Sequence, residues 1–115
     1  MKIDLDHIYT ICDNDREFVG DMLATFVRIT PVSIDDLNDS FENKNWLQVS
    51  KAAHKIKPSV LMLGIDQFSA LIKEIELLAK DPKDTNELAT KISLFNQHSV
   101  EVLTDIEDLL ASKRY

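Results

Sequence analysis

The chain has 115 residues, of which 44% are hydrophobic and 29% charged, and this composition indicates one globular domain rather than a disordered segment. Its formal net charge of −7 at pH 7 argues against a nucleic-acid partner, because contacts with phosphate groups need a basic surface. It contains no run of about 18 apolar residues that could cross a membrane, and its first residues do not resemble a signal peptide. The single cysteine, Cys12, cannot form an internal disulfide. We therefore expect a monomeric cytoplasmic protein without nucleic-acid or membrane partners.

The first three predicted helices occupy residues 4–12, 14–29 and 30–42. Apolar residues recur at helical spacing in each of them, and no long run alternates between β-branched and polar residues. Asn14 is the expected cap of the second helix. Pro31 is expected to open the third helix, because proline is tolerated at the first helical position.

The last three predicted helices occupy residues 46–63, 66–80 and 84–112. Gly64 is expected to end the first of them in a left-handed conformation, and Asp66 to cap the next. All the connections are short, so successive helices should run antiparallel.

The predicted fold is therefore all-α and comprises residues 1–115 as a single domain. Its core is an antiparallel up-down bundle of the last four helices. Two additional N-terminal helices are expected to pack against one side or end of this four-helix bundle.

His54 lies in the middle of the fourth predicted helix, away from the apolar stripe of that helix. At about 100° per residue, it lies roughly 140° from the centre of the stripe. The imidazole should therefore point into solvent, with Lys57 one turn away on the same side. Free imidazole is mostly neutral and nucleophilic at pH 7, and a nearby cation can offset the charge of a phosphoryl group. The stripe consists of Val49, Ala53, Ile56, Val60 and Leu63.

The surface around His54 carries features that suggest a docking patch. Leu47 and Leu61 lie one heptad to either side of it, and exposed leucines around a reactive polar group are typical of an interaction surface. Ser50, one turn before His54, is small enough to leave room for a loop of a partner. The alternative is that the first two helices cover both leucines.

Glu76 is a candidate for orienting the imidazole. When the chain folds back at Gly64, residues near position 74 come level with His54, and Glu76 lies at the edge of the apolar face of its helix. Its carboxylate could accept a hydrogen bond from one ring nitrogen and leave the other nitrogen free to attack. An ordinary solvated glutamate remains the alternative.

Pro58 is unusual because it lies inside a predicted helix, four residues after His54. Proline has no backbone N–H and its ring displaces the carbonyl four residues earlier, so the helix should bend or loosen at His54. The lost hydrogen bond indicates either a functional feature or an accommodated kink. Lys57 should be exposed, so its removal is expected to leave the fold unchanged.

The chain resembles the histidine-containing phosphotransfer (HPt) domain family over nearly its whole length. The upstream resemblance lies in an acidic segment that ends in phenylalanine and in a Leu-x-x-Phe signal. The central resemblance lies in an Ala-His-x-(Leu/Ile)-Lys pattern followed by a glycine ten residues after the histidine. The matching segments are Asp15-Arg16-Glu17-Phe18, Leu23 to Phe26, Ala53-His54-Lys55-Ile56-Lys57, Gly64, Phe68 and Ile75-Glu76.

This resemblance implies that His54 is the phosphoacceptor and Lys57 its supporting cation. The chain would take a phosphoryl group from an aspartate on one receiver domain, of a hybrid sensor kinase or a response regulator, and pass it to another. It would be a non-autonomous carrier without ATP binding or a cofactor of its own, and Mg²⁺ would be held by the receiver. Pro58 departs from the family pattern, which has glycine there, and this departure bears on how closely a partner can approach.

Three other classes of protein are the alternatives to this carrier. A metal site in a helical bundle is disfavoured because no Glu-x-x-His occurs, the nearest match being Asp4-Leu5-Asp6-His7. A histidine-kinase dimerisation helix is disfavoured because Lys55 stands where that family has an acidic residue. The remaining alternative is a helical adaptor of the same fold that binds a partner without carrying phosphate, and Pro58 is the feature that favours it.

Overall fold

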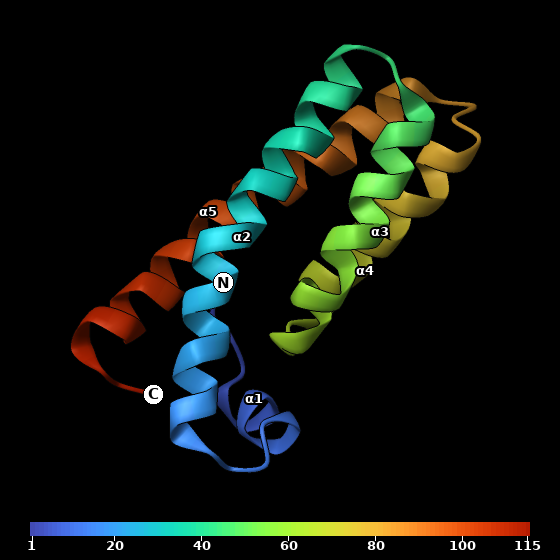
Figure 1. Cartoon of the computed structure of the whole chain (residues 1–115). Coiled ribbons are helices and arrows are strands. Elements are labelled where there is room, and N and C mark those ends of the chain that lie inside the picture. Colours follow the sequence, from blue (N-terminus) through green and yellow to red (C-terminus); the bar gives the residue numbers. More distant parts are fainter.

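The computed structural model describes residues 1–115 and contains helices without any strand, so the prediction of an all-α fold is confirmed. None of the helices is both long and apolar enough to span a membrane. Figure 1 shows the five helices, which are α1 (Leu5–Ile11), α2 (Arg16–Glu42), α3 (Trp46–Met62), α4 (Asp66–Lys80) and α5 (Thr85–Ser112).

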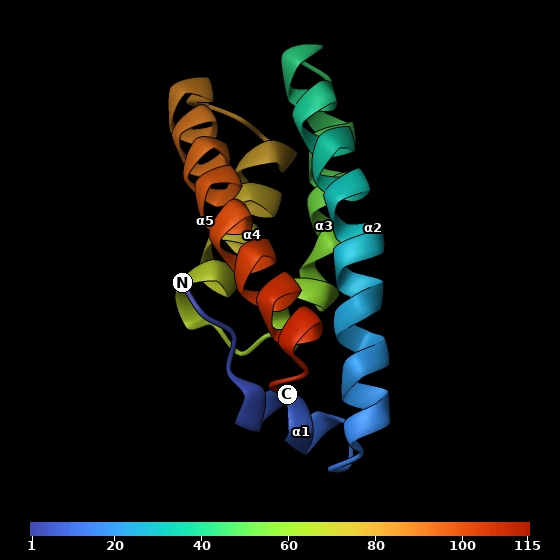
Figure 2. The ribbon, with the colours of Figure 1, turned by 90° about the vertical axis from the view of Figure 1, so that its left-hand side faces the viewer.

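The four long helices form a bundle, and the whole chain is elongated, with extents of 43 × 22 × 20 Å. Successive helices alternate in direction, and α1 lies across one end, where it contacts α2 and α3 (Figures 1 and 2). Helix α3 packs against α2 and α4, and α5 packs against the same two helices from the other side. As a result α3 and α5 lie diagonally opposite one another, and they present different faces of the bundle to solvent.

One hydrophobic core of 23 buried residues runs through the bundle, and all four long helices contribute to it. At its centre the rings of Phe68 on α4 and Phe95 on α5 stack with their centroids 4.7 Å apart. Aromatic pairs of this kind stabilise a core beyond the area that they bury. This packing joins α4 to α5.

Side-chain caps begin three of the long helices. The side chains of Asp15, Asn45 and Asp84 accept backbone N–H groups at the starts of α2, α3 and α5, and such caps satisfy donors that have no partner within the helix. The predicted cap Asn14 is wrong, because this residue has a φ of 57° in the preceding turn. The predicted cap Asp66 is also wrong, because α4 begins after Ile65 without a side-chain cap.

The predicted helix break at Pro31 is wrong, since α2 continues through it. Pro31 cannot donate to the carbonyl of Val27, which removes one backbone hydrogen bond. The residues on either side of it nevertheless share one buried face, which includes Phe26, Thr30 and Ile34. Burial of this continuous face outweighs the lost hydrogen bond, so the bundle carries one additional N-terminal helix instead of two.

Gly64 makes the turn that returns α4 alongside α3. Its φ of +70° confirms the predicted left-handed conformation, which glycine adopts without steric cost. A Cβ atom at this position would also lie 2.9 Å from the Cβ of His7 on α1. The turn therefore needs glycine both for its backbone conformation and for the close approach of α1.

Candidate functional site

His54 is exposed on the outer face of α3. Its side chain retains 74% of its accessible surface, whereas Ala53 and Ile56 on the opposite side of the helix are buried. The prediction that the ring points into solvent is confirmed. A partner molecule can therefore reach this imidazole without any rearrangement of the bundle.

Glu76 of α4 lies directly beside the imidazole. The Nδ1 atom of His54 is 3.0 Å from Oε2 of Glu76 and 3.3 Å from Oε1. Only 7% of the Glu76 side chain is exposed, so the alternative of an ordinary solvated glutamate is wrong. The Ser50 hydroxyl donates to the backbone carbonyl of Glu76 at 3.2 Å and thereby links α3 to α4 at this level.

Lys57 of α3 is the third member of this site, beside His54 and Glu76. Its Nζ atom donates to Oε1 of Glu76 at 2.9 Å, and its side chain is 28% exposed. The expectation of an exposed lysine is therefore wrong, because the ammonium group lies half-buried between the two helices. The bundle thus places a cation and an exposed imidazole each within hydrogen-bonding distance of the same buried carboxylate.

The charge of Glu76 is fixed by these contacts. The hydrogen bond from Lys57 lowers the pKa of Glu76, and the hydrogen bond from His54 acts in the same direction, while burial opposes them. An ionised carboxylate only accepts hydrogen bonds, so Nδ1 of a neutral His54 carries the ring hydrogen. The Nε2 atom then keeps a free lone pair, which makes it the nucleophilic nitrogen.

A shallow hollow of about 380 Å³ opens beside the imidazole. Leu47 at its edge is 66% exposed, and Leu61 and Pro58 are also exposed, so α1 and α2 do not cover the leucines. Ser50 does not offer the open surface that was expected, because its side chain is buried and bonded to α4. The hollow is lined by Leu47, Ser50, Lys51, His54, Glu76 and Lys80.

Helix α3 runs through Pro58 without a break. The helix remains continuous to Met62, although Pro58 has no N–H to donate to the carbonyl of His54. Pro58 itself is exposed. The proline therefore occupies the accessible surface one turn beyond the imidazole.

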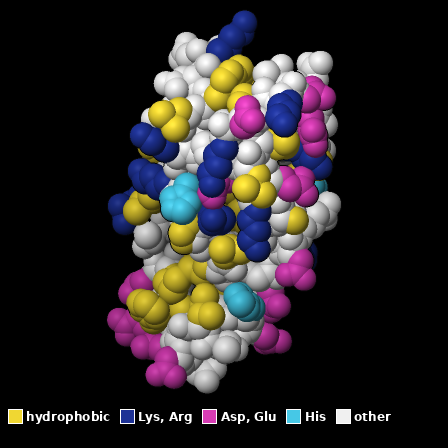
Figure 3. All heavy atoms as spheres, turned by 90° about the vertical axis from the view of Figure 1, so that its right-hand side faces the viewer, with side chains coloured by type: hydrophobic (Ala, Val, Ile, Leu, Met, Phe, Trp, Pro, Cys, Tyr) yellow, Lys and Arg dark blue, Asp and Glu magenta, His cyan; other side chains and the backbone are white.

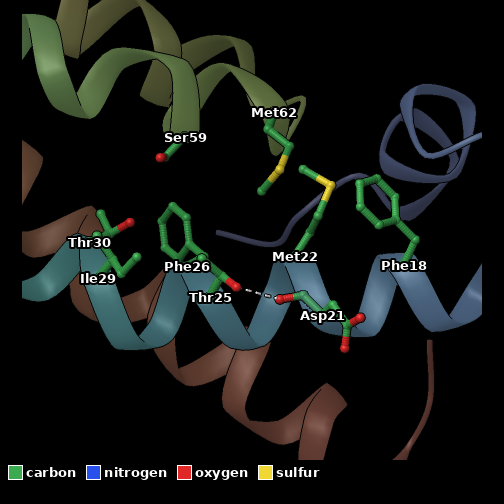
Figure 4. A pocket seen from close by; sticks show the side chains of 9 residues that line it. All are labelled: Phe18, Asp21, Met22, Thr25, Phe26, Ile29, Thr30, Ser59 and Met62. Atoms are coloured by element: carbon green, nitrogen blue, oxygen red, sulfur yellow. Dashed lines mark hydrogen bonds between the residues drawn. The ribbon is translucent and has the colours of Figure 1, made fainter.

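Sequence reasoning missed a second hollow, which lies between α2 and α3. Figure 4 shows Phe18, Met22 and Phe26 of α2 on one side of it and Ser59 and Met62 of α3 on the other. Its volume is about 250 Å³. Helical spacing marks such aromatic residues as core, but Phe18 is exposed at the wall of this hollow.

The other two histidines lie elsewhere. His7 is exposed on α1, and its backbone N–H bonds to the side chain of Asp4. His98 on α5 has only 15% of its side chain exposed, and its Nε2 atom is buried without a hydrogen-bond partner. Neither ring combines exposure with a buried carboxylate, and no group of three or more His, Cys, Asp or Glu side chains could hold a metal ion.

Comparison with known protein families matches residues 21–112 to the Hpt domain. The match covers most of the chain and includes the helices that carry His54 and Glu76, so the chain belongs to the Hpt domain family. Domains of this family act in phosphotransfer within two-component phosphorelays, as phosphocarriers that interact with receiver domains. Searches of curated proteins and of solved structures found no match.

Proposed function

We propose that the chain carries a phosphoryl group on Nε2 of His54, accepting it from an aspartyl phosphate of one receiver domain and passing it to an aspartate of another. The single observation that carries this proposal is an exposed imidazole whose Nδ1 atom lies 3.0 Å from a buried carboxylate. This arrangement leaves one nucleophilic nitrogen accessible and holds the ring in one orientation.

The proposed transfer is a single displacement at phosphorus. The Nε2 lone pair of His54 attacks, a P–N bond forms, and the P–O bond to the aspartate of the donor breaks, with its electron pair leaving on the carboxylate. No proton needs to move, because the ring hydrogen stays on Nδ1. The ring becomes positively charged, and Glu76 stabilises that charge from 3.0 Å away. Passing the phosphoryl group to a second receiver reverses these bond changes.

Lys57 has two roles in this proposal. It keeps Glu76 ionised through their 2.9 Å hydrogen bond, and its charge offsets that of the phosphoryl group. The exposed Leu47, Pro58 and Leu61 would contact the receiver domain around the imidazole. The chain needs no cofactor of its own, and the receiver would supply Mg²⁺.

The experiment uses the whole chain and a receiver domain phosphorylated on its aspartate. We expect an acid-labile, alkali-stable phosphate on the wild-type protein and none on the His54→Gln variant, since a phosphoramidate has this stability pattern. His7→Gln is the matched control, because it removes another exposed histidine and should label like the wild type. Persistent labelling of His54→Gln contradicts the assignment, and receiver binding without any labelling supports the adaptor alternative.

The proposed role of Glu76 has its own test. Glu76→Gln keeps an oxygen that can accept from Nδ1 but removes the negative charge, so transfer at saturating receiver should slow about tenfold, the value of one charge-assisted hydrogen bond. The concentration of receiver at half-saturation should change little, because Glu76 is buried. An unchanged transfer rate would show that the carboxylate only holds the helices together.

A further inference from the structure

The charges of the chain are divided unequally between its two sides. Residues 46–80, which form the α3–α4 hairpin, carry five lysines against three carboxylates, a net charge of +2. The rest of the chain carries eight Lys and Arg residues against 17 carboxylates, a net charge of −9. Helix α3 contains no acidic residue at all. The phosphoacceptor thus lies on the basic side of an acidic protein.

Four lysines of this hairpin are free to act on a partner. They are exposed, and none has a carboxylate oxygen within 4.0 Å, whereas Lys57 is paired with Glu76. Two of the four, Lys51 and Lys80, line the hollow beside His54. Figure 3, which looks onto this side of the bundle, shows Lys and Arg side chains around a histidine. We name the four residues the basic patch, which consists of Lys51, Lys55, Lys73 and Lys80.

The carboxylates of the hairpin do not neutralise the basic patch. Glu76 is buried and already bonded to two partners, and Glu74 is paired with Lys91 of α5 at 2.9 Å. Asp66 is in the first turn of α4 and lines a separate hollow together with Lys73, whereas Lys51 and Lys80 line the hollow at His54. The positive charges of Lys51 and Lys80, which have no carboxylate partner, therefore act on a molecule that approaches the imidazole.

We propose that the basic patch is an electrostatic docking surface, which captures an acidic protein face and orients it onto His54. This inference rests on the proposed function. The donor would bring an acyl phosphate to the imidazole, and this group carries close to two negative charges. The patch attracts such a face, while the acidic remainder of the chain repels it from every other side, so that collisions concentrate on His54.

An acidic protein face fits the patch better than a membrane surface does. The patch is small and lies on a protein of net charge −7, which an anionic bilayer would repel over its larger contact area. The occupant must also place one phosphorus atom against one imidazole, which calls for a shaped partner. Steering of this kind raises association rates by roughly 10- to 1,000-fold and weakens steeply with salt.

The test compares two variants with the same change of charge. Lys51→Glu with Lys80→Glu reverses two charges beside His54, and Lys2→Glu with Lys113→Glu reverses two exposed charges near the chain termini, on the opposite side (Figure 2). Each receiver domain encoded in the source genome is expressed and phosphorylated, and the one that labels His54 fastest is used. Stopped-flow association is measured from about 0.02 to 0.5 M salt, the range over which screening becomes complete.

The patch variant should associate at least about tenfold more slowly at low salt and lose most of the salt dependence. Its transfer rate at saturating receiver should fall by a smaller factor than its association rate, since neither lysine forms a hydrogen bond or ion pair with the imidazole. The terminal variant should behave like the wild type. The association rate of a milder pair, Lys51→Gln with Lys80→Gln, should lie between those of the patch and terminal variants. This pair keeps the test valid if the charge-reversed variant does not fold.

The outcomes distinguish failure of the docking surface from failure of the proposed phosphotransfer. Normal labelling of His54 with equal association rates in the patch and terminal variants overturns the docking surface alone. Failure of every receiver to label His54 overturns the proposed function, and the docking surface with it. The last measurement is sedimentation with vesicles of about 30% phosphatidylserine. If the wild type binds these vesicles and the patch variant does not, the partner of the basic patch is a lipid surface and not a protein.

Discussion

Lys57 donates a 2.9 Å hydrogen bond to Glu76, a carboxylate on a different helix with only 7% of its side chain exposed. The other oxygen of this carboxylate lies 3.0 Å from Nδ1 of His54. One buried group thus holds two side chains of α3 in place from the α4 side. The lysine that sequence patterns assign to the bound phosphate is also part of the support that orients the imidazole.

Lys57→Ala should lower the free energy of unfolding by about 1–3 kcal/mol, because it leaves Glu76 buried with a single weaker partner. This expectation replaces the view that the lysine is exposed and structurally dispensable. Urea denaturation at pH 7 measures the change. The control is Lys55→Ala on the same helix, which is exposed and should stay within about 0.5 kcal/mol of the wild type. Equal stability of the two variants would mean that the Lys57–Glu76 contact contributes nothing.

Glu76 should also make stability depend on pH. Its pKa is lowered in the folded state, chiefly by the hydrogen bond from Lys57, so it stabilises the fold above its ordinary pKa of about 4.5. This contribution is lost as the pH falls through the lowered folded-state pKa, where the carboxylate takes up a proton. The difference in unfolding free energy between the wild type and Glu76→Gln should therefore shrink between pH 6 and about pH 3.

A control for this pH dependence is Glu74→Gln, which removes a half-exposed carboxylate whose partner is on α5. Its difference from the wild type should vary less with pH, because exposed ion pairs contribute little to stability. A wild-type advantage over Glu76→Gln that stays constant down to pH 3 would contradict the stabilising role of the charged form.

Helical periodicity was enough to predict the exposure of His54, because one apolar stripe determines which side of a helix faces the core. The left-handed turn at Gly64 was equally predictable, since glycine adopts a positive φ without steric cost. The positive φ of Lys44 and Lys113 at two other helix ends could not be predicted in this way. The contact between Glu76 and the imidazole was only one of two alternatives, and the other was a solvated glutamate. Glu76 is 22 residues away along the chain, and its position depends on the register between α3 and α4.

Features that depend on tertiary packing could not be read from local signals. The continuity of α2 through Pro31 depends on a buried face that extends on both sides of the proline. The burial of Ser50 depends on the close approach of α4, whose Glu76 carbonyl accepts its hydroxyl. Both errors arose because local rules treat each helix separately, whereas neighbouring helices decide which local cost is tolerated.

Pro58→Ala should raise the free energy of unfolding by about 1–3 kcal/mol, because alanine restores an N–H that can bond to the carbonyl of His54. The surface position of Pro58 means that no core contact is lost in exchange. Thermal and urea denaturation measure the gain, and Ser59→Ala next to it is the control for a change of side chain alone. If Pro58→Ala is no more stable than the wild type, α3 has already accommodated the proline at no cost.

A second variant, Pro58→Gly, compared with Pro58→Ala shows whether the side chain at this position matters for the partner. A transfer rate that differs between Pro58→Ala and Pro58→Gly at equal receiver concentration would indicate that the bulk at this position limits approach to His54. Because Pro58 lies one turn from the imidazole, the effect should fall on the concentration of receiver needed for half-maximal rate. Identical kinetics would mean that the partner does not contact this surface.

Asn38 of α2 and Asn96 of α5 form a reciprocal pair of amide hydrogen bonds, of 3.1 Å and 2.8 Å, between half-buried side chains. Replacing either residue by alanine leaves the other amide without its partner and should cost about 1–2 kcal/mol. The double alanine variant should cost less than the sum of the single ones, with a coupling energy of about 0.5–1.5 kcal/mol. Urea denaturation of the wild type, the two single variants and the double variant gives this double-mutant cycle. Gln97→Ala, at an exposed neighbouring position, should leave the free energy of unfolding unchanged. Additive losses would show that the two amides are bonded to water or backbone instead of to one another, and that the α2–α5 contact is held by the apolar core alone.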